Sequence, residues 1–271
     1  MPITLYKAPD CLRCKIVKDY LESAHIAYEA FDLGEHKDIV NAFYRNNRAS
    51  LYRNPEGVEF PMFHDQDKQV IRQGAGLILS WLVAGKALDG CILRSDLLHG
   101  WISGLELSRC PEGREAHFLE VVRLLSGGGL KVFLRTDGRR ADLLQTILDE
   151  GLAARVALDI PGPPGIYPAA VGGAAPGPEE LKKTIALISA HKDGVVRLWL
   201  APLAEAAGEY RWITPEEAGE AAKYIREAWG DMTLPFAIQA ASETAGLEPL
   251  DNLLPYRARV RNHLPKADIL K

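Results

Sequence analysis

Residues 1–85 alternate short apolar runs with stretches in which apolar positions recur at helical spacing. This pattern predicts short β-strands separated by helices. The last two strands are joined by a polar turn, which is typical of a hairpin, and the last helix ends at Gly85, a common stop signal. The predicted strands are residues 3–6, 26–31, 60–63 and 69–71, and the predicted helices are residues 14–21, 36–46 and 77–83.

From residue 100 onward, strands and helices alternate along the chain. The alternation favours βαβ units and a parallel sheet. About five units are present, too few for an eight-unit barrel but enough for a partial one. The Pro- and Gly-rich residues 161–178 are expected to form a loop at the sheet end. The predicted strands are residues 101–103, 130–134, 156–160, 195–200 and 235–239, and the predicted helices are residues 114–125, 141–150, 179–189 and 215–229.

The predicted fold class is therefore α/β, and the two parts of the chain differ in their pattern of strands and helices. Residues 1–85 form an N-terminal domain, and residues 86–97 form a linker. Residues 98–240 form a C-terminal partial (β/α) barrel. Residues 241–271 are a polar C-terminal tail, which we expect to pack on the barrel and cover the end of the sheet.

Composition narrows the class of protein without indicating an activity. The 271 residues are 47% hydrophobic and 25% charged, close to the soluble globular average, and the net charge of −4 gives no electrostatic argument for nucleic acid or an anionic membrane. No apolar run reaches the roughly 20 residues of a bilayer span. The N-terminus shows no signal peptide. We therefore expect a cytoplasmic protein with neither a nucleic-acid nor a membrane partner.

The strongest chemical signal is the motif Cys11-Leu12-Arg13-Cys14, which follows a strand and begins a helix. A thiolate at a helix N-terminus is stabilised by unpaired backbone N–H groups and by the helix dipole. Cys11 is therefore the predicted nucleophile, and Cys14, one turn further on, is placed to resolve the mixed disulfide that Cys11 forms. Arg13 and Lys7 add positive charge that favours the thiolate further.

Two other interpretations of the motif are a zinc site and buried thiols without a role. A structural zinc site needs a second pair of ligands. The remaining cysteines, Cys91 and Cys110, stand alone, and no histidine lies at ligand spacing beside them. Because a CxxC within a βαβ pattern is typical of thioredoxin-like redox sites, the sequence favours redox chemistry with no bound metal.

The segment Phe60-Pro61-Met62-Phe63 places a proline at the start of a strand. A proline is otherwise disfavoured inside a sheet, and a cis bond there would leave neighbouring backbone groups free to pair with a bound thiol. Residues 1–85 resemble the glutaredoxins, which have a thioredoxin fold. The resemblance rests on the strand ITLY, Lys7, the motif CLRC, the segment FPMF and residues 71–76.

The resemblance implies a cis Pro61 that faces Cys11, and a groove for glutathione or another thiol substrate. This chain departs from the family between the cysteines, where Leu12-Arg13 replaces the usual Pro-Tyr. The last segment also lacks the acidic pair of the family after its glycines. The residues assigned to the groove and its charge are Lys7, Arg13, Phe60, Pro61, Gly74 and Gly76.

Polar residues stand at the ends of three predicted strands in the second half: Glu106, Asp137 and Asp159. The carboxyl ends of parallel strands are where such folds place ligands. An acidic residue there is also a common helix cap or turn former. Together with Gly104, the three residues make a candidate ligand site.

The segments ISGLE, RTDG and LDI resemble motifs of the radical S-adenosylmethionine activating enzymes, in the same order, over roughly residues 98–265. That family binds an iron–sulfur cluster through a CxxxCxxC loop, a spacing that occurs nowhere in this chain. A cluster built from the four scattered cysteines is disfavoured, because such sites draw on closely spaced ones. The resemblance therefore implies a degenerate barrel without radical chemistry.

The favoured hypothesis is a cytosolic thiol–disulfide oxidoreductase that requires no cofactor. Its partners are thiol or disulfide substrates, including glutathione, and its second domain gives partner specificity. The alternative is a non-catalytic accessory protein whose barrel binds S-adenosylmethionine or an anaerobic enzyme partner. A third hypothesis, an iron–sulfur enzyme, needs the cysteines of both halves to converge: Cys11, Cys14, Cys91 and Cys110.

Overall fold

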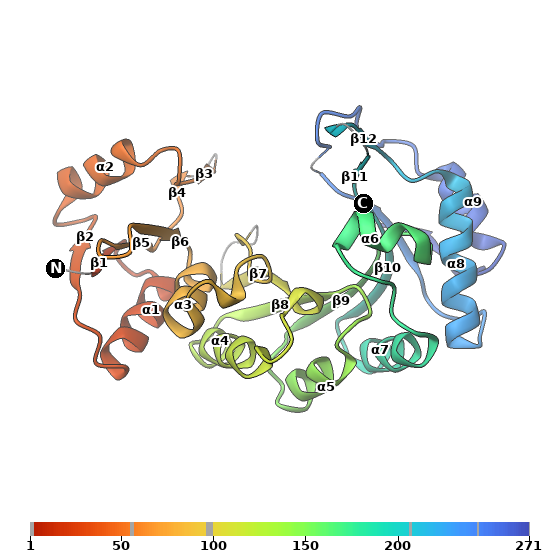
Figure 1. The fold of residues 1–271 in the computed structure, drawn as a ribbon, viewed down its shortest axis with the longest axis horizontal. Coiled ribbons are helices and arrows are strands. Elements are labelled where there is room, and N and C mark those ends of the chain that lie inside the picture. The colour runs from red at the N-terminus through yellow and green to blue at the C-terminus, as the bar shows by residue number, and fades with distance from the viewer. Residues whose placement is uncertain (1–2, 55–56, 96–99, 206–207, 243, 271) are drawn as a thin grey trace. The chain divides into compact units, whose positions relative to one another are not determined.

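The computed structural model describes residues 3–54, 57–95, 100–205, 208–242 and 244–270 (Figure 1). The chain forms two compact units. The first contains Met1–Phe133 and Glu150–Ala154, and the second contains Leu134–Asp149 and Arg155–Lys271. The border between these units falls inside a strand, whereas the domain division inferred from the sequence lies between residues 85 and 98 and stays a prediction.

The first unit begins with the strands β1 (Ile3–Lys7), β2 (Glu29–Asp32), β5 (Met62–Asp65) and β6 (Val70–Gln73) and the helices α1 (Leu12–Ser23), α2 (Lys37–Asn46) and α3 (Ala75–Ala84). The strands form one sheet in the order β2-β1-β5-β6. Strand β1 pairs parallel with β2 and antiparallel with β5, and β5 forms a hairpin with β6. Every element expected in residues 1–85 is present. A two-residue hairpin of β3 (Arg53–Asn54) and β4 (Gly57–Val58) was not expected.

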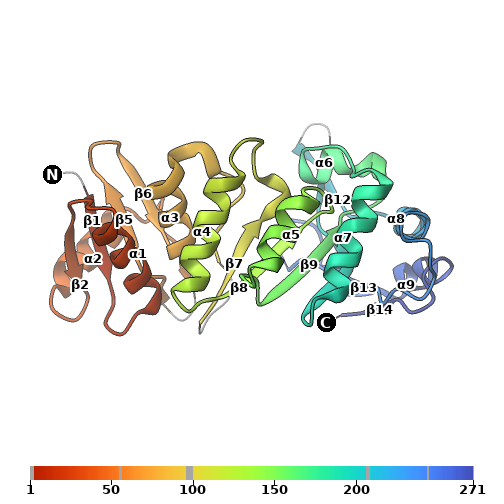
Figure 2. The same ribbon diagram turned by 90° about the horizontal axis from the view of Figure 1, so that it is seen from below.

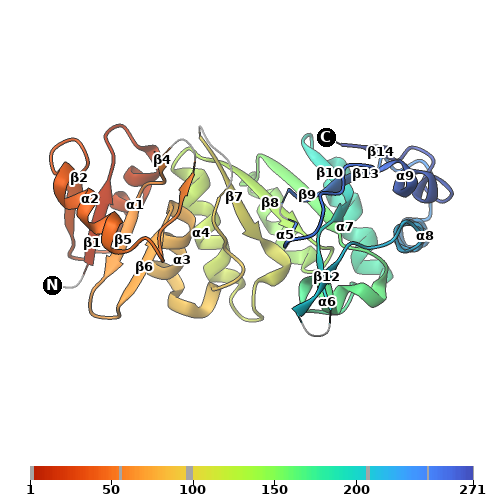
Figure 3. The same ribbon diagram turned by 90° about the horizontal axis from the view of Figure 1, so that it is seen from above.

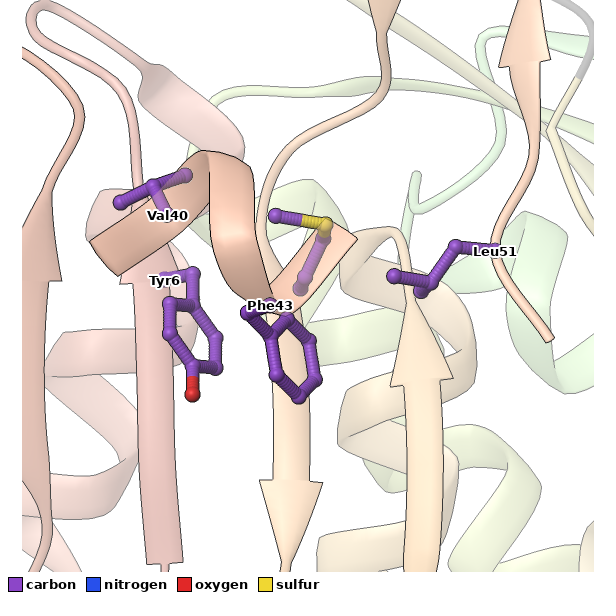
Figure 4. Packing of buried hydrophobic residues seen from close by; sticks show 5 residues of the cluster. Tyr6, Val40, Phe43 and Leu51 are labelled. Carbon is purple, nitrogen blue, oxygen red and sulfur yellow. The ribbon is translucent and has the colours of Figure 1, made fainter. Parts of the chain in front are cut away.

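Alternating side chains of β1 and β5 cover the two faces of this sheet. Tyr6 and Met62, which are opposite each other in register, pack with Phe43 of α2 (Figure 4). The rings of Tyr6 and Phe43 are stacked with their centroids 3.9 Å apart. The next pair, Leu5 and Phe63, is fully buried on the opposite face. Helix α2 therefore covers one face, and α1 and α3 lie on the other (Figure 1 and Figure 3).

Helix α3, with the sequence AGLILSWLVA, is apolar around its whole circumference. A helix of this kind is buried on more than one side. Here α3 packs against α1 and β6 on one side and against α4 (Glu115–Gly127) and β7 (Trp101–Glu106) on the other (Figure 2). Because α3 is shared in this way, the first unit is continuous from β1 to α4.

Residues 86–95, which belong to the predicted linker, are packed rather than free. They begin in the 3₁₀ helix η1 (Gly85–Leu88) and then run beside β7, where Ile92 forms an antiparallel bridge with Leu105. Residues 96–99, at the end of the predicted linker and the start of the predicted barrel, lie outside the described residues. The buried side chains of this segment are Leu88, Cys91 and Ile92.

The parallel sheet expected in the second half is present. Its strands are β7, β8 (Lys131–Thr136), β9 (Arg155–Ile160), β10 (Gly194–Leu200), β13 (Ala237–Ala240) and β14 (Asp268–Ile269), in the order β14-β13-β10-β9-β8-β7. Adjacent strands from β9 to β14 pair in parallel. The helices α5 (Ala141–Asp149) and α7 (Pro178–Ala190) lie beside each other, and α7 packs on β9 and β10. This arrangement is consistent with a partial (β/α) barrel. None of the described helices is both long and apolar enough to cross a membrane.

Two short helices replace the single long loop that was expected over residues 161–178. They are η3 (Pro164–Ile166) and α6 (Tyr167–Val171). Tyr167 is completely buried, and its hydroxyl donates a hydrogen bond of 3.2 Å to the backbone carbonyl of Asp137. Helices this short carry too few turns to show a hydrophobic period, so the composition of the segment dominated the prediction.

The C-terminal tail forms secondary structure of its own. Helix α9 (Leu254–Arg261) packs on α8 (Pro215–Trp229), and β14 adds a parallel edge strand to β13. The tail therefore adds a strand to the edge of the sheet, whereas we expected it to cover the end of the sheet. Residues 243 and 271 of the tail lie outside the described residues. A small hairpin of β11 (Leu203–Ala204) and β12 (Tyr210–Arg211) was also not expected.

Candidate functional site

Cys11 and Cys14 lie at the start of α1 and are joined by a disulfide. Cys11 is the N-cap residue, and its sulfur accepts a hydrogen bond of 3.1 Å from the Cys14 backbone N–H. An N-cap side chain of this kind satisfies one of the N–H groups that a helix leaves unpaired in its first turn. The motif thus lies at a strand–helix junction, where the sequence placed it.

The two cysteines differ in how far solvent reaches them. Cys14 is 3% exposed, whereas Cys11 is only half-buried. Both line a pocket of about 570 Å³ at the end of β1. An incoming disulfide therefore meets Cys11 first. The other residues that line this pocket are Lys7, Ala8, Pro9, Asp10, Leu12, Lys15, Lys18, Asp19 and Asp32.

Lys7 lines the same pocket, and its positive charge is paired with a carboxylate. Its ammonium group is 2.5 Å from Asp32, and this hydrogen bond lowers the pKa of Asp32. Lys7 therefore contributes less uncompensated positive charge near Cys11 than the sequence suggested. Asp32 and Asp10 are pocket residues that the sequence analysis missed, because an isolated acid in a turn gives no signal of its own.

Arg13 is held by groups outside the pocket lining. Its guanidinium donates a hydrogen bond of 3.0 Å to the carboxylate of Glu59 and one of 2.7 Å to the backbone carbonyl of Trp101. The side chain is 14% exposed. Arg13 therefore fastens the start of α1 to the strand β7, and its role in binding a substrate stays a prediction.

The Phe60–Pro61 peptide bond is cis, as the glutaredoxin resemblance implies. The Pro61 carbonyl accepts a hydrogen bond of 2.9 Å from the N–H of Gly74, which is the N-cap of α3. Pro61 and Gly74 are thus brought together. Gly76 is buried in α3, where an added Cβ would lie 3.3 Å from Ile92. It makes a close contact with the segment before β7, and its place in a substrate groove stays a prediction.

Cys91 and Cys110 are buried, and neither is part of a disulfide. The Cys91 thiol donates a hydrogen bond of 3.1 Å to the carbonyl of Leu88, and burial raises the pKa of Cys91 to about 12. Within the part of the chain that the structure describes, no three His, Cys, Asp or Glu side chains are grouped closely enough to hold a metal ion.

We expect Cys91 to resist alkylation in the native protein at pH 8. The reactive form of a cysteine is the thiolate, and a buried thiol with a pKa near 12 stays protonated at that pH. After reduction of the disulfide, iodoacetamide should modify Cys11 first and Cys91 only in denaturant, as peptide mass spectrometry would show. Rapid labelling of Cys91 in the folded protein would contradict its placement.

Gly104 lies in β7 with a φ of +80°, a region that favours glycine. An added Cβ would lie 2.6 Å from the carbonyl oxygen of Leu93 and 2.8 Å from that of Arg94. The N–H of Glu106, two residues further on, donates to the carbonyl of Cys91 at 2.9 Å. The segment that precedes β7 therefore packs closely against the end of this strand. The absence of a side chain at Gly104 makes the close contact possible.

Replacing Gly104 with alanine should lower the free energy of unfolding by at least about 2 kcal/mol, because a positive φ and an overpacked Cβ both cost energy. Urea denaturation would measure the change. Gly127→Ala is the matched control, since Gly127 lies in α4 and nothing stands within 4 Å of its added Cβ. Equal stability of the two variants would refute this account of β7.

Asp137 is 6% exposed and lies in the second unit. Its carboxylate accepts hydrogen bonds of 2.9 and 2.5 Å from the guanidinium of Arg139, and these bonds raise the pKa of Arg139. Asp137 therefore fixes the turn after β8, and a role in binding a ligand stays a prediction.

Asp159 joins neighbouring strands of the second unit. It lies opposite Arg197 in the register of β9 and β10, and its carboxylate accepts hydrogen bonds of 2.6 and 3.3 Å from Arg197. It also accepts one of 2.5 Å from Arg135 of β8. Arg197 donates in turn to Gln239 of β13 at 2.5 Å, and both guanidiniums lie over the ring of Trp199. The predicted ligand residue Asp159 is thus the centre of a polar network on the sheet.

Comparisons with known proteins do not assign this chain to a family. No protein-family model matches it, and no curated protein matches it. Among solved structures, it matches the crystal structure of endo-1,4-beta-mannanase from Eisenia fetida, at 11% sequence identity and a TM-score of 0.24. The match covers 56% of this chain and about half, 54%, of the mannanase chain. A likeness at this score carries no argument about fold or function.

Proposed function

We propose that this protein is a thiol–disulfide oxidoreductase whose reactive groups are Cys11 and Cys14. The proposal is carried by the disulfide between them at the N-terminus of α1, with Cys11 open to a pocket and Cys14 buried. Backbone N–H groups and the helix dipole at this position stabilise a thiolate. The buried Cys14 is close enough to displace any group that becomes attached to Cys11.

The arrangement of the first unit supports a thioredoxin-like, and more narrowly a glutaredoxin-like, interpretation of residues 1–85. A parallel pair of strands is joined to an antiparallel hairpin, with α2 on one face of the sheet and α1 and α3 on the other. The cis Phe60–Pro61 bond agrees with the same resemblance.

The reaction is a pair of thiol–disulfide exchanges. The Cys11 thiolate attacks one sulfur of a substrate disulfide, so that the substrate S–S bond breaks, a mixed disulfide forms on Cys11, and the first substrate thiolate leaves and takes a proton. Cys14 then loses its proton and attacks the Cys11 sulfur, which releases the second substrate thiol and closes the Cys11–Cys14 disulfide. Two electrons from a thiol reductant, such as two molecules of glutathione, restore the dithiol and leave an oxidised disulfide.

The second half supplies surfaces next to the motif, which supports a role in choosing partners. Arg13 is bonded to the Trp101 carbonyl of β7, and Gly128, at the end of α4, lies so near Ile16 of α1 that an added Cβ would be 2.4 Å from its side chain. A protein substrate that reaches Cys11 would therefore meet β7 and α4 as well. A reducing cytoplasm is the compartment that suits such a cycle.

Binding of S-adenosylmethionine at the strand ends is not the function that the geometry supports best. Backbone carbonyls close on Gly104, and Asp137 and Asp159 are engaged with arginine side chains.

A redox titration of the whole protein tests the proposal. The reduced protein is equilibrated in glutathione buffers of graded potential, and free Cys11 and Cys14 are counted by alkylation and mass spectrometry. We expect one reversible two-electron transition, and catalytic reduction of a peptide–glutathione mixed disulfide. A potential near about −200 to −230 mV would match glutaredoxins and one near about −270 mV thioredoxin. A pair that cannot be reduced reversibly, or that gives no turnover, would remove the proposal.

A further inference from the structure

Asp10, the residue directly before Cys11, is a charged group of the redox pocket that the reaction described above does not use. It is exposed and lines the same pocket as the two cysteines. Because neighbouring Cα atoms are about 3.8 Å apart, the backbone fixes Asp10 beside the nucleophile. A substrate whose sulfur reaches Cys11 therefore brings its own neighbouring residues close to Asp10.

The backbone of Asp10 has an unusual conformation, in the turn between β1 and α1. Its φ is +51°, in the left-handed region where asparagine and aspartate are the most common residues after glycine. Asparagine is therefore compatible with this position. The charge of Asp10 can be removed by Asp10→Asn while the backbone keeps its conformation.

The three lysines that line the pocket each pair with an acidic side chain. The pairs are Lys7–Asp32 at 2.5 Å, Lys15–Asp19 at 2.8 Å and Lys18–Glu22 at 3.5 Å. Asp10, by contrast, forms no ion pair with any residue that the structure describes. The lining of the pocket therefore presents one uncompensated negative charge, and this charge is next to the nucleophile.

A negative charge beside the nucleophile distinguishes substrates by their own charge. A lysine or arginine next to the reacting cysteine of a substrate is attracted to Asp10, whereas a carboxylate at the same place is repelled. Glutathione carries two carboxylates, and each lysine of the pocket lining already has an acidic partner. A basic peptide therefore matches the charge of the pocket better than glutathione does.

We propose that Asp10 is a specificity-determining residue, which selects disulfides whose reacting cysteine is flanked by lysine or arginine. This inference rests on the proposed function, because it concerns the substrate of the same pair of sulfurs. The cationic side chain of the substrate lies at the Asp10 carboxylate while Cys11 attacks the neighbouring sulfur. The exchange reaction itself is unchanged, and the charge decides how fast each substrate forms the mixed disulfide.

The test compares two peptide substrates in single-turnover reactions with the reduced whole protein. The peptides differ only in the residues on both sides of their cysteine, lysine in one and glutamate in the other, and each cysteine is linked to the uncharged thiol β-mercaptoethanol. Formation of the Cys11–Cys14 disulfide is followed by quenching and alkylation. The wild type should react faster with the lysine peptide, and Asp10→Asn should reduce the ratio of the two rate constants about fivefold, an effect on the scale of an exposed charge pair.

The ratio separates the charge of the substrate from other effects of the substitution, because a changed reactivity of Cys11 would alter both rate constants by the same factor. The matched control is Asp67→Asn, which removes an exposed acid from the turn between β5 and β6 and gives the same net charge. That turn lies at the Ile3 end of β1, whereas Cys11 follows the Lys7 end. The control should therefore keep the wild-type ratio.

Ionic strength gives a second measurement, which needs no variant. Added salt screens exposed charges, so it should slow the reaction of the wild type with the lysine peptide and speed that with the glutamate peptide. An unchanged ratio in Asp10→Asn, or a wild-type ratio that salt does not alter, would overturn the proposal. Failure of the proposed function looks different, because the reduced wild type would then react with neither peptide.

Discussion

Replacing Cys11 with serine should abolish the reduction of a mixed disulfide down to the uncatalysed rate. The thiolate is the nucleophile in disulfide exchange, and a serine hydroxyl at the N-cap cannot form the mixed disulfide. Cys14, at 3% exposure, cannot take over the first step because its sulfur is buried. The measurement is turnover of a peptide–glutathione mixed disulfide by the whole protein, with far-ultraviolet circular dichroism to show that the variant is folded.

Cys14→Ser should behave differently from Cys11→Ser. The first exchange remains possible, so a mixed disulfide between Cys11 and the substrate should accumulate and appear in intact-mass spectra. Cys91→Ala is the control, because Cys91 is buried and outside the motif, and should leave turnover unchanged. Full activity of Cys11→Ser would disprove the assignment of the nucleophile, and no trapped adduct on Cys14→Ser would disprove that of the resolving thiol.

Replacing Asp159 with alanine should lower the free energy of unfolding by about 3–5 kcal/mol, the usual cost of removing one partner from a buried ion pair. The side chains of Asp159 and Arg197 are each 9% exposed, so the arginine could not recover its solvation in place of the lost carboxylate. Arg135, which is 24% exposed, would lose the same partner. Urea denaturation followed by tryptophan fluorescence measures the change.

The matched control for Asp159 is Asp142→Ala. Asp142 also pairs with a cation, Lys183, but its side chain is 97% exposed. Exposed pairs contribute little to stability, so this variant should unfold like the wild type. If Asp159→Ala were as stable as Asp142→Ala, the network around Asp159 would not stabilise the sheet as described.

Local signals explain why some elements could be predicted closely. Helix α8 begins and ends at the predicted residues, because capping residues at both of its ends mark the boundaries in the local sequence. Thr214 and Glu217 form a capping box around Pro215, and Gly230 ends the helix with a φ of +84°. The strand–helix junction at Cys11 is a signal of the same kind.

The elements that were missed depend on partners far away in the chain. Strand β14 is two residues long and is defined only by its pairing with β13, for example of Asp268 with Ala237. The segment after η1 is too short to show a hydrophobic period, yet Cys91 and Ile92 in it are buried where it pairs with β7. The hydrophobic pattern within either segment does not indicate that the segment pairs with a distant strand.

The two cysteines of the candidate site could be predicted from the sequence, whereas most of the residues that contact the motif could not. Cys11 and Cys14 form a recognisable motif, whereas Glu59 contacts Arg13 of that motif from 46 positions further along the sequence. Lys7 lines the pocket beside Cys11, and the roles assigned to Lys7 and Arg13 stay predictions. The carboxylates that engage them, Asp32 and Glu59, could only be found from the fold.

Because α3 is buried on two sides, the protein cannot be truncated directly after α3 without exposing apolar surface. A fragment that stopped at residue 85 would present a helix of almost uninterrupted apolar residues to water on the side that α4 and β7 normally occupy. Such a piece should aggregate on expression, and no proteolytic nick near residue 85 should release a soluble redox fragment. Residues 1–85 therefore depend on α4 and β7 to cover one side of α3.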